Sequence, residues 1–226
     1  MPTLLITGAN RGIGLELARQ YAAEGWRVHA TCRAPEKAQD LKALAGTVSV
    51  HRLDVTAEDA VRALAAHLEE EAIDLLINNA GVLAPQQDLM HLGLDIWRHE
   101  LAVNSLAPFA IARAFLPQLR RGAGKTIANL TSRMGSIADN TSGGYYAYRS
   151  SKAALNAVMK SMAIDLARDG IKVCLLHPGW VQTAMGGPQA LIDAQESATA
   201  LRRIIARLTL KDSGRFFSHT GEELPW

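Results

Sequence analysis

Short apolar segments rich in β-branched residues alternate along the whole chain with longer segments in which apolar residues recur every three or four positions. The first pattern is typical of buried strands, and the second of amphipathic helices. The predicted strands cover residues 3–7, 27–31, 48–53, 73–77, 126–130, 172–177 and 215–218. The predicted helices cover residues 12–23, 35–44, 57–70, 95–119, 148–168 and 193–208.

This order of elements predicts an α/β fold. Strands separated by helices form right-handed βαβ units, which build a doubly wound parallel sheet of Rossmann type with helices on both faces. No linker, repeat or charge run divides the 226 residues, so we expect a single domain over residues 1–226. Residues 184–195 contain Gly186-Gly187-Pro188 and little periodicity, which predicts a mobile loop that covers substrate.

Composition narrows the possible partners. Lys and Arg number 24 against 22 acidic residues, and a net charge of +2 gives no field that would attract nucleic acid. The chain has no signal-peptide pattern and no apolar run of membrane-spanning length, so we expect a cytoplasmic protein. Cys32 and Cys174 are predicted to be reduced core residues, and the seven histidines form no metal-binding pattern.

The first predicted strand runs into a glycine-rich turn that opens a helix. Glycines in such a turn let the backbone bend sharply and approach a pyrophosphate, while the helix N-terminus attracts the phosphate charge. A structural turn alone is the alternative, but the position between strand and helix favours a dinucleotide site. Its predicted residues are Gly8, Asn10, Arg11, Gly12, Ile13 and Gly14.

The second predicted strand indicates which dinucleotide binds. Enzymes that use the unphosphorylated cofactor commonly place an acidic residue about 20 residues beyond the glycines. Here Arg33 stands near that position, and Arg11 lies inside the loop. Because guanidinium groups bind phosphate through paired hydrogen bonds, we expect NADP(H) to be preferred, with NAD(H) possible. The alternative is that Arg33 is a solvated surface residue.

A tyrosine and a lysine mark the candidate chemistry. Tyr148 and Lys152 are four residues apart, so they share one face of a predicted helix. An ammonium beside a phenol favours the phenolate, which makes Tyr148 a candidate proton donor and acceptor. Taken alone, the same spacing also fits two residues that face solvent.

Several motifs together identify a family. In chain order they are the glycine loop, Asn78-Asn79-Ala80-Gly81, Asn104, Ser132, Tyr148, Lys152 and Pro178-Gly179. With them the chain resembles the short-chain dehydrogenase/reductase family over essentially its full length. The segments 134–149 and 221–226 are more narrowly similar to the C-factor and sniffer-type carbonyl reductase branch.

The resemblance implies four catalytic residues. It implies that Tyr148 exchanges a proton with the substrate oxygen, that Lys152 stabilises its phenolate and binds the nicotinamide ribose, and that Ser132 hydrogen-bonds the substrate oxygen. It also implies that Asn104 holds a water on the lysine side. The interval from Ser132 to Tyr148 is longer than in many relatives, so Ser136 and Ser142 are alternatives to Ser132.

The resemblance also implies the remaining cofactor contacts. Asp54 would bind the adenine amino group, with the alternative that it caps the turn before Thr56. The other implied contacts are Val55, Asn79, Ala80 and Gly81 near the adenosine and Pro178, Gly179, Val181 and Thr183 near the nicotinamide.

Together these residues predict reduction of an aldehyde or ketone, a small-molecule substrate, with NADP(H). The alternatives are oxidation of an alcohol with NAD(H), and a dinucleotide-sensing signalling protein of C-factor type. Small residues in the segments 95–119 and 148–168 permit close helix packing, and relatives pair these two helices across a two-fold axis. We therefore expect a homodimer or a homotetramer.

Overall fold

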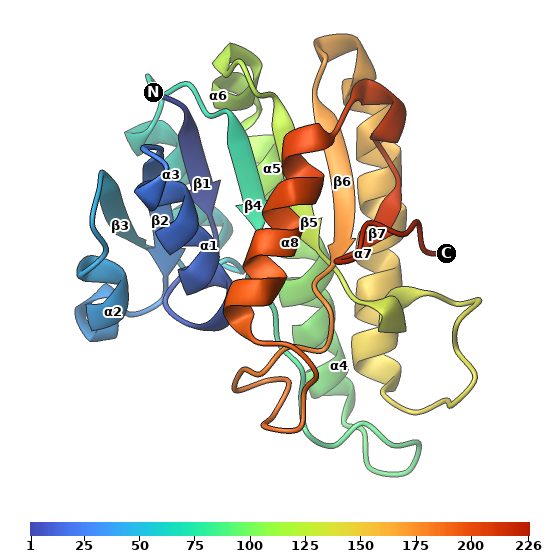
Figure 1. Cartoon of the computed structure of the whole chain (residues 1–226). Helices are drawn as coiled ribbons and strands as arrows, with labels where there is room; N and C mark the ends of the chain where they lie inside the picture. Colours follow the sequence, from blue (N-terminus) through green and yellow to red (C-terminus); the bar gives the residue numbers. More distant parts are fainter.

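The computed structural model describes all 226 residues and confirms the α/β fold (Figure 1). Seven parallel strands form one sheet in the order β3-β2-β1-β4-β5-β6-β7. Their bounds are β1 Thr3–Ile6, β2 Arg27–Cys32, β3 Val48–Arg52, β4 Leu75–Asn78, β5 Thr126–Leu130, β6 Lys172–His177 and β7 Phe216–Ser218. The order reverses direction between β1 and β4, which is where doubly wound sheets bind ligands.

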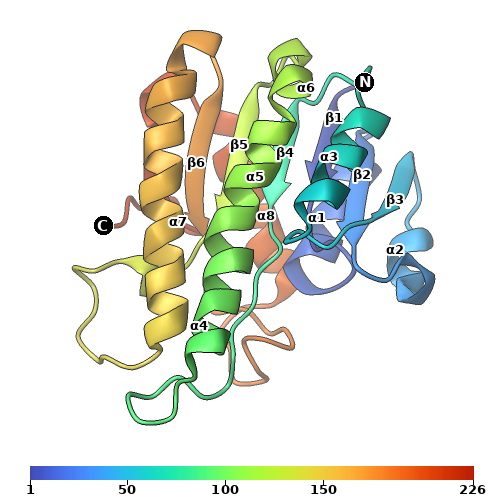
Figure 2. The same cartoon turned by 180° about the vertical axis from the view of Figure 1, so that it is seen from behind.

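Helices cover both faces of this sheet. In Figure 1, α1 and α8 lie in front of the sheet, and Figure 2 shows α3, α5 and α7 on the opposite face. The main helices are α1 Gly12–Ala23, α2 Gln39–Lys42, α3 Glu58–His67, α4 Leu94–Leu101, α5 Ala107–Ala114, α6 Leu116–Arg121, α7 Tyr146–Asp165 and α8 Ala194–Arg207. The region predicted as one helix over 35–44 is a 3₁₀ turn, Pro35–Lys37, followed by the short α2.

Two hydrophobic cores follow from the alternation of side chains along the strands. Leu4 and Ile6 of β1 pack with α1 and α8, whereas Leu5 between them packs with the helices on the other face. Burial on both faces explains why the strands are continuously apolar rather than alternating. Both cysteines are buried and free, in agreement with the sequence analysis.

The prediction of one continuous helix over 95–119 is wrong. The segment consists of α4, a π-helical turn at Ala102–Leu106, α5 and α6. Pro108 lacks the N–H that would bond the carbonyl of Asn104, and its ring would clash with that carbonyl in a regular helix. The π-helical turn, which contains one residue more than a turn of α-helix, therefore includes Asn104, one of the predicted catalytic residues.

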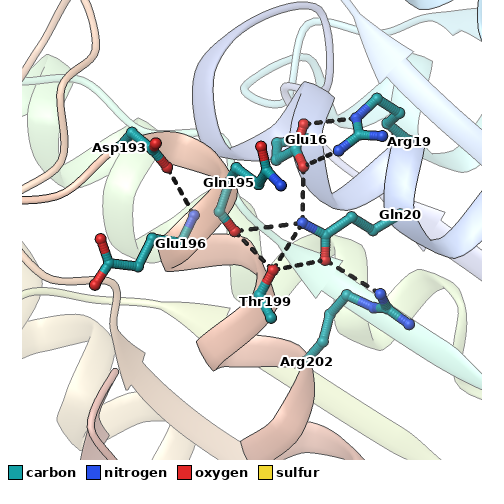
Figure 3. A network of polar contacts seen from close by, with 8 residues as sticks. All are labelled: Glu16, Arg19, Gln20, Asp193, Gln195, Glu196, Thr199 and Arg202. Atoms are coloured by element: carbon teal, nitrogen blue, oxygen red, sulfur yellow. Dashed lines mark hydrogen bonds and ion pairs between the residues drawn. The ribbon is translucent and has the colours of Figure 1, made fainter.

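A polar network joins α1 to α8 on the front face (Figure 3). Gln20, which is buried, donates to Glu16 Oε1 at 2.7 Å and to Thr199 Oγ1 at 3.1 Å, and it accepts from Arg202 at 3.1 Å. Arg202 also lies over the ring of Tyr21 at 4.6 Å. The helix that follows the glycine turn is thus fixed to the helix that follows the 184–193 loop.

Candidate active site

The glycine turn is built as a close approach of backbone to backbone. Gly8 has φ +64°, and a Cβ atom there would lie 2.9 Å from Cα of Ala80. At Gly14 a Cβ atom would lie 2.6 Å from the carbonyl oxygen of Gly8 and would collide with the amide of Asn79. That amide donates to the carbonyls of Thr7 at 2.8 Å and Gly8 at 2.9 Å, so it fastens the turn to the end of β4.

One cavity of about 450 Å³ extends from this turn along the carboxyl edge of the sheet. Of the residues predicted from sequence, the structure places these on its wall: Gly8, Asn10, Arg11, Gly12, Ile13, Gly14, Arg33, Asp54, Val55, Asn79, Ala80, Gly81, Tyr148, Lys152, Pro178 and Thr183. Residues far apart in sequence therefore surround a single elongated space.

Other residues differ from the sequence-based list. Asn104, Ser132, Gly179 and Val181 lie outside the cavity wall, and Val181 is buried and pairs with Ile192. Some wall residues were missed. Cys32, Leu53 and Leu130 stand at apolar strand ends, which look like core in the sequence. The others carry no motif, and they are Val82, His99, Val103, Thr131 and Gln182. Ala184 and Met185 also lie on the wall and belong to the loop predicted to cover substrate.

The adenosine end of the cavity carries both predicted arginines. Arg11 and Arg33 are exposed and form no ion pair with an acidic residue. A third arginine, Arg52, donates to the carbonyl of Arg33 at 3.0 Å and is paired with Glu36 at 2.8 Å. The two unpaired guanidinium groups thus remain accessible at the end of β2.

Asp54 closes a turn and also lies on the cavity wall. Its Oδ1 accepts from the N–H of Thr56 at 3.0 Å and from the Thr56 hydroxyl at 2.7 Å, which closes a turn after β3. These hydrogen bonds lower the pKa of the carboxyl. The same side chain belongs to a residue of the cavity wall, so its turn role does not remove it from the site.

Tyr148 and Lys152 lie at the other end of the cavity, and Ser132 lies beside Tyr148 behind the cavity wall. Ser132 follows β5 and accepts a hydrogen bond from the N–H of Met134 at 3.1 Å. Burial raises the pKa of Tyr148, and the neighbouring Ser132 hydroxyl acts in the opposite direction. Lys152 donates to the carbonyl oxygen of Leu130 at 2.8 Å, and its Nζ lies 5.8 Å from the Tyr148 ring centroid.

Burial shifts the pKa values of both groups. It raises the pKa of Tyr148 to about 12, which is opposite to the shift toward the phenolate that the sequence predicts from a neighbouring ammonium. Burial also lowers the pKa of Lys152 to about 8.

The two alternative serines make other contacts. Ser136 donates to the carbonyl oxygen of Trp226 at 3.2 Å, and Ser142 accepts from Arg149 at 2.9 Å. Both lie in the segment between the end of β5 and α7. Of the three serines, Ser132 is the one whose hydroxyl acts on the pKa of Tyr148.

Asn104 is buried in the π-helical turn and connects three segments. Its amide donates to the carbonyl of Val82 at 2.9 Å and to the Ser151 hydroxyl at 3.0 Å, and its Oδ1 accepts from the N–H of Val82 at 2.9 Å. The side chain therefore fixes the chain after β4 to α7. Since Pro108 has no N–H, the main-chain carbonyl of Asn104 does not receive the hydrogen bond that residue i+4 donates in a regular α-helix.

A glycine turn at a helix N-terminus, with a tyrosine and a lysine at the far end of the same cavity and a serine beside the tyrosine, is the arrangement of a dinucleotide-dependent oxidoreductase site. The family model described as short chain dehydrogenase matches residues 2–191. The chain belongs to the short-chain dehydrogenase/reductase family, which confirms the resemblance inferred from its motifs.

Known proteins refine this placement. The C-signal protein of Myxococcus xanthus is 46% identical over 166 residues, which cover 74% of this chain and all of that protein. The carbonyl reductase Sniffer of D. melanogaster superposes with a TM-score of 0.94 at 35% identity, and the match covers all of both chains. An NADPH-bound carbonyl reductase from chicken fatty liver gives a TM-score of 0.94 at 33% identity, with 100% and 99% coverage.

No helix has both the length and the apolar character that a membrane crossing requires.

Proposed function

We propose that this protein is an NADP(H)-dependent carbonyl reductase that acts on a small aldehyde or ketone. The observation that carries the proposal is the cavity itself, which has the glycine turn at one end and Tyr148 and Lys152 on its wall at the other. Reduction of a carbonyl needs a proton donor beside the carbonyl oxygen. Tyr148, a buried phenol on that wall, is the residue that we assign to this role.

The residues of the cavity fit the phosphorylated dinucleotide. Gly8 and Gly14 leave the space that a pyrophosphate requires beside the start of α1. Arg11 and Arg33 supply two guanidinium groups without acidic partners for a 2′-phosphate. The solved chicken carbonyl reductase, which is similar over the whole chain, binds NADPH.

Each residue then has one role in the proposed reaction. The bound cofactor supplies the hydride to the carbonyl carbon. Ser132 hydrogen-bonds the carbonyl oxygen, and Tyr148 transfers its proton to that oxygen as negative charge develops there. Lys152 holds the ribose beside them, and Asn104 fixes the helix that carries Lys152 through Ser151.

We also propose that the loop predicted over residues 184–195 closes over the substrate; it is shorter than predicted and ends at Asp193, because α8 begins at Ala194. Trp180 donates to the carbonyl of Gly186 at 2.8 Å, and Met185 lies on the cavity wall and is half exposed. The segment is anchored at both ends, by the pairing of Val181 with Ile192 and by α8. Closure would place apolar side chains over the carbonyl group and exclude water.

The test measures NADPH oxidation with a panel of aldehydes and ketones. Tyr148→Phe should lower kcat by about 10²–10⁴-fold while NADPH binding is retained, because proton transfer by a positioned side chain contributes this much. Tyr146→Phe, two residues earlier and exposed, is the matched control. Full activity of Tyr148→Phe would refute the mechanism, and tight NADPH binding without turnover of any carbonyl would favour the sensing alternative.

A further inference from the structure

Glu100 is a buried carboxyl next to the active site that belongs to no sequence motif. It lies in α4, one turn before Asn104, and is 1% exposed. Its Oε1 accepts from the N–H of Ala84 at 2.6 Å and from the amide of Gln87 at 2.6 Å, whereas its Oε2 has no partner among protein atoms. A buried carboxyl with one oxygen left without a hydrogen bond is costly to the fold.

Gln87 connects this carboxyl to the catalytic helix. It is 4% exposed, donates to Glu100 and to the carbonyl of Ala84 at 3.1 Å, and accepts from the N–H of Tyr148 at 2.8 Å. Tyr148 is the third residue of α7, so its N–H has no partner within the helix. Gln87 therefore caps the first turn of α7 from another segment, and Glu100 fixes the orientation of the Gln87 amide.

Glu100 and Asn104 together hold the segment after β4. Asn104 pairs with both backbone groups of Val82, and Glu100 binds the N–H of Ala84 two residues further on. Glu100 and Asn104 are four residues apart and so share one face of the helical segment. They therefore bind the backbone of Ala84 and Val82, which are two residues apart in the segment after β4. Trp97, on the same helix, donates to Ser150 of α7 at 2.7 Å.

The charge of Glu100 affects the pKa values of Tyr148 and Lys152. The charged or titratable groups that face it are Tyr148 and Lys152 from α7 and the neighbouring His99, and residues 82–87 contribute none. Burial is the main cause that raises the pKa of Glu100, and hydrogen bonds from Ala84 and Gln87 oppose it. As an anion it raises the pKa of both Tyr148 and Lys152.

We propose that Glu100 is a positioning residue for Tyr148, which holds the first turn of α7 through Gln87 and sets the pH range in which the Tyr148–Lys152 pair transfers protons. The two parts have different physical origins. The hydrogen bonds depend on the shape of the carboxyl, and the pH range depends on its charge. Variants can therefore separate them. The pH part rests on the proposed carbonyl reduction, whereas the positioning part does not.

The first experiment removes the charge and keeps the shape. Glu100→Gln retains a carbonyl oxygen that accepts from Ala84 and Gln87, but it loses the anion. Without the anion, the pKa values of Tyr148 and Lys152 are both lower, so both groups lose their protons at lower pH. The alkaline decline of kcat/KM for carbonyl reduction should therefore move to lower pH by on the order of one unit. Asp95→Asn, on the same helix and exposed, changes the net charge equally and should leave the decline in place.

The second experiment removes the cap. Gln87→Met keeps the volume but loses the acceptor for the Tyr148 N–H. Hydrogen exchange of residues 146–150 should become at least tenfold faster, and kcat should fall more than KM changes, with the alkaline decline unmoved. Glu100→Asp keeps the charge but shortens the reach to Gln87, so it should retain the wild-type pH position and show faster exchange.

An unshifted alkaline decline in a folded Glu100→Gln protein overturns the electrostatic part. Unchanged exchange in Gln87→Met overturns the positioning part. Hydrogen exchange needs no turnover, so it remains decisive if the protein reduces no carbonyl compound. If Gln87→Met shows faster hydrogen exchange but the wild type reduces no carbonyl compound, the positioning role of Gln87 stands and only the proposed function is refuted.

Discussion

Gly14→Ala tests whether the close backbone approach at the start of α1 serves the dinucleotide. In an ordinary helix interior, this substitution stabilises by about 1 kcal/mol because alanine is the better helix former. Here the added methyl group would lie 2.6 Å from the carbonyl oxygen of Gly8 and would collide with the Asn79 amide. Both obstacles are fixed, because that amide is bonded to two backbone carbonyls.

The magnitude follows from these opposing effects. Overpacking a rigid site costs about 1–3 kcal/mol, so the net change in the free energy of unfolding should be a loss of about 0–2 kcal/mol. The turn at Gly8 to Gly12 must move to admit the methyl group, and in the proposed function this turn is the surface that binds the cofactor pyrophosphate. We expect a loss of about 1–2 kcal/mol in binding NADPH, which is roughly a five- to thirty-fold rise in Kd.

The assay is a fluorescence titration with NADPH, accompanied by urea unfolding. Gly93→Ala is the matched control, since its φ is −73° and the nearest atom to an added Cβ is Ile96 Cδ1 at 3.9 Å. The control should bind NADPH like the wild type. A Gly14→Ala protein that gains stability like a plain helical substitution and binds NADPH normally would refute the assignment of this turn to the cofactor.

Three further predictions concern specificity, acid stability and assembly. Arg33→Asp should lower the preference for NADPH over NADH about ten- to a hundred-fold in kcat/KM, because a charge-assisted hydrogen bond contributes about 1.5–3 kcal/mol; an unchanged ratio would remove Arg33 from the phosphate site. Burial lowers the pKa of His51 to about 4 from an ordinary value of 6.5. Between these two pH values the unfolded chain binds a proton that the folded chain does not, so the free energy of unfolding should decrease as the pH falls from about 6.5 to about 4. His51→Gln should flatten that decline in urea unfolding, and an equally steep decline would contradict the pKa shift. Leu106 in the π-helical turn, Phe109 in α5 and Ile164 in α7 are exposed apolar residues, so light scattering should give a dimer or tetramer that Phe109→Asp dissociates; a monomeric wild type would refute this.

The fold could be predicted from the sequence because each strand is a continuous apolar run between helical patterns. Burial on both faces of a parallel sheet produces that pattern directly. The break in the 95–119 segment was missed because proline is also common in the first turn of helices, and Pro108 by itself does not distinguish a kink from a new helix. The distinction comes from Asn104 and Val82, whose contact forms only in the folded chain.

In the candidate site, too, some residues could be predicted from the sequence and others could not. Residues with special chemistry, such as Tyr148 and Lys152, could be selected from sequence because their types and spacing are uncommon together. Gln87 and Glu100 could not, since a glutamine in a loop and a glutamate in a helix are ordinary at the surface. Their burial beside α7 depends on how the segment after β4 crosses α4, which no local pattern encodes.

The contacts of Lys152 indicate how it acts in the proposed site. Its Nζ donates to Leu130 at the end of β5 and lies 5.8 Å from the Tyr148 ring centroid, so it is held on the cavity wall between the strand and the tyrosine. In that place the ammonium can hold the ribose of a bound cofactor, while Tyr148 faces the substrate end. Burial raises the pKa of Tyr148 to about 12, and Ser132 opposes that shift. A phenol beside a serine can supply its proton once negative charge develops on a carbonyl oxygen, which is the role that the proposed reduction gives to Tyr148.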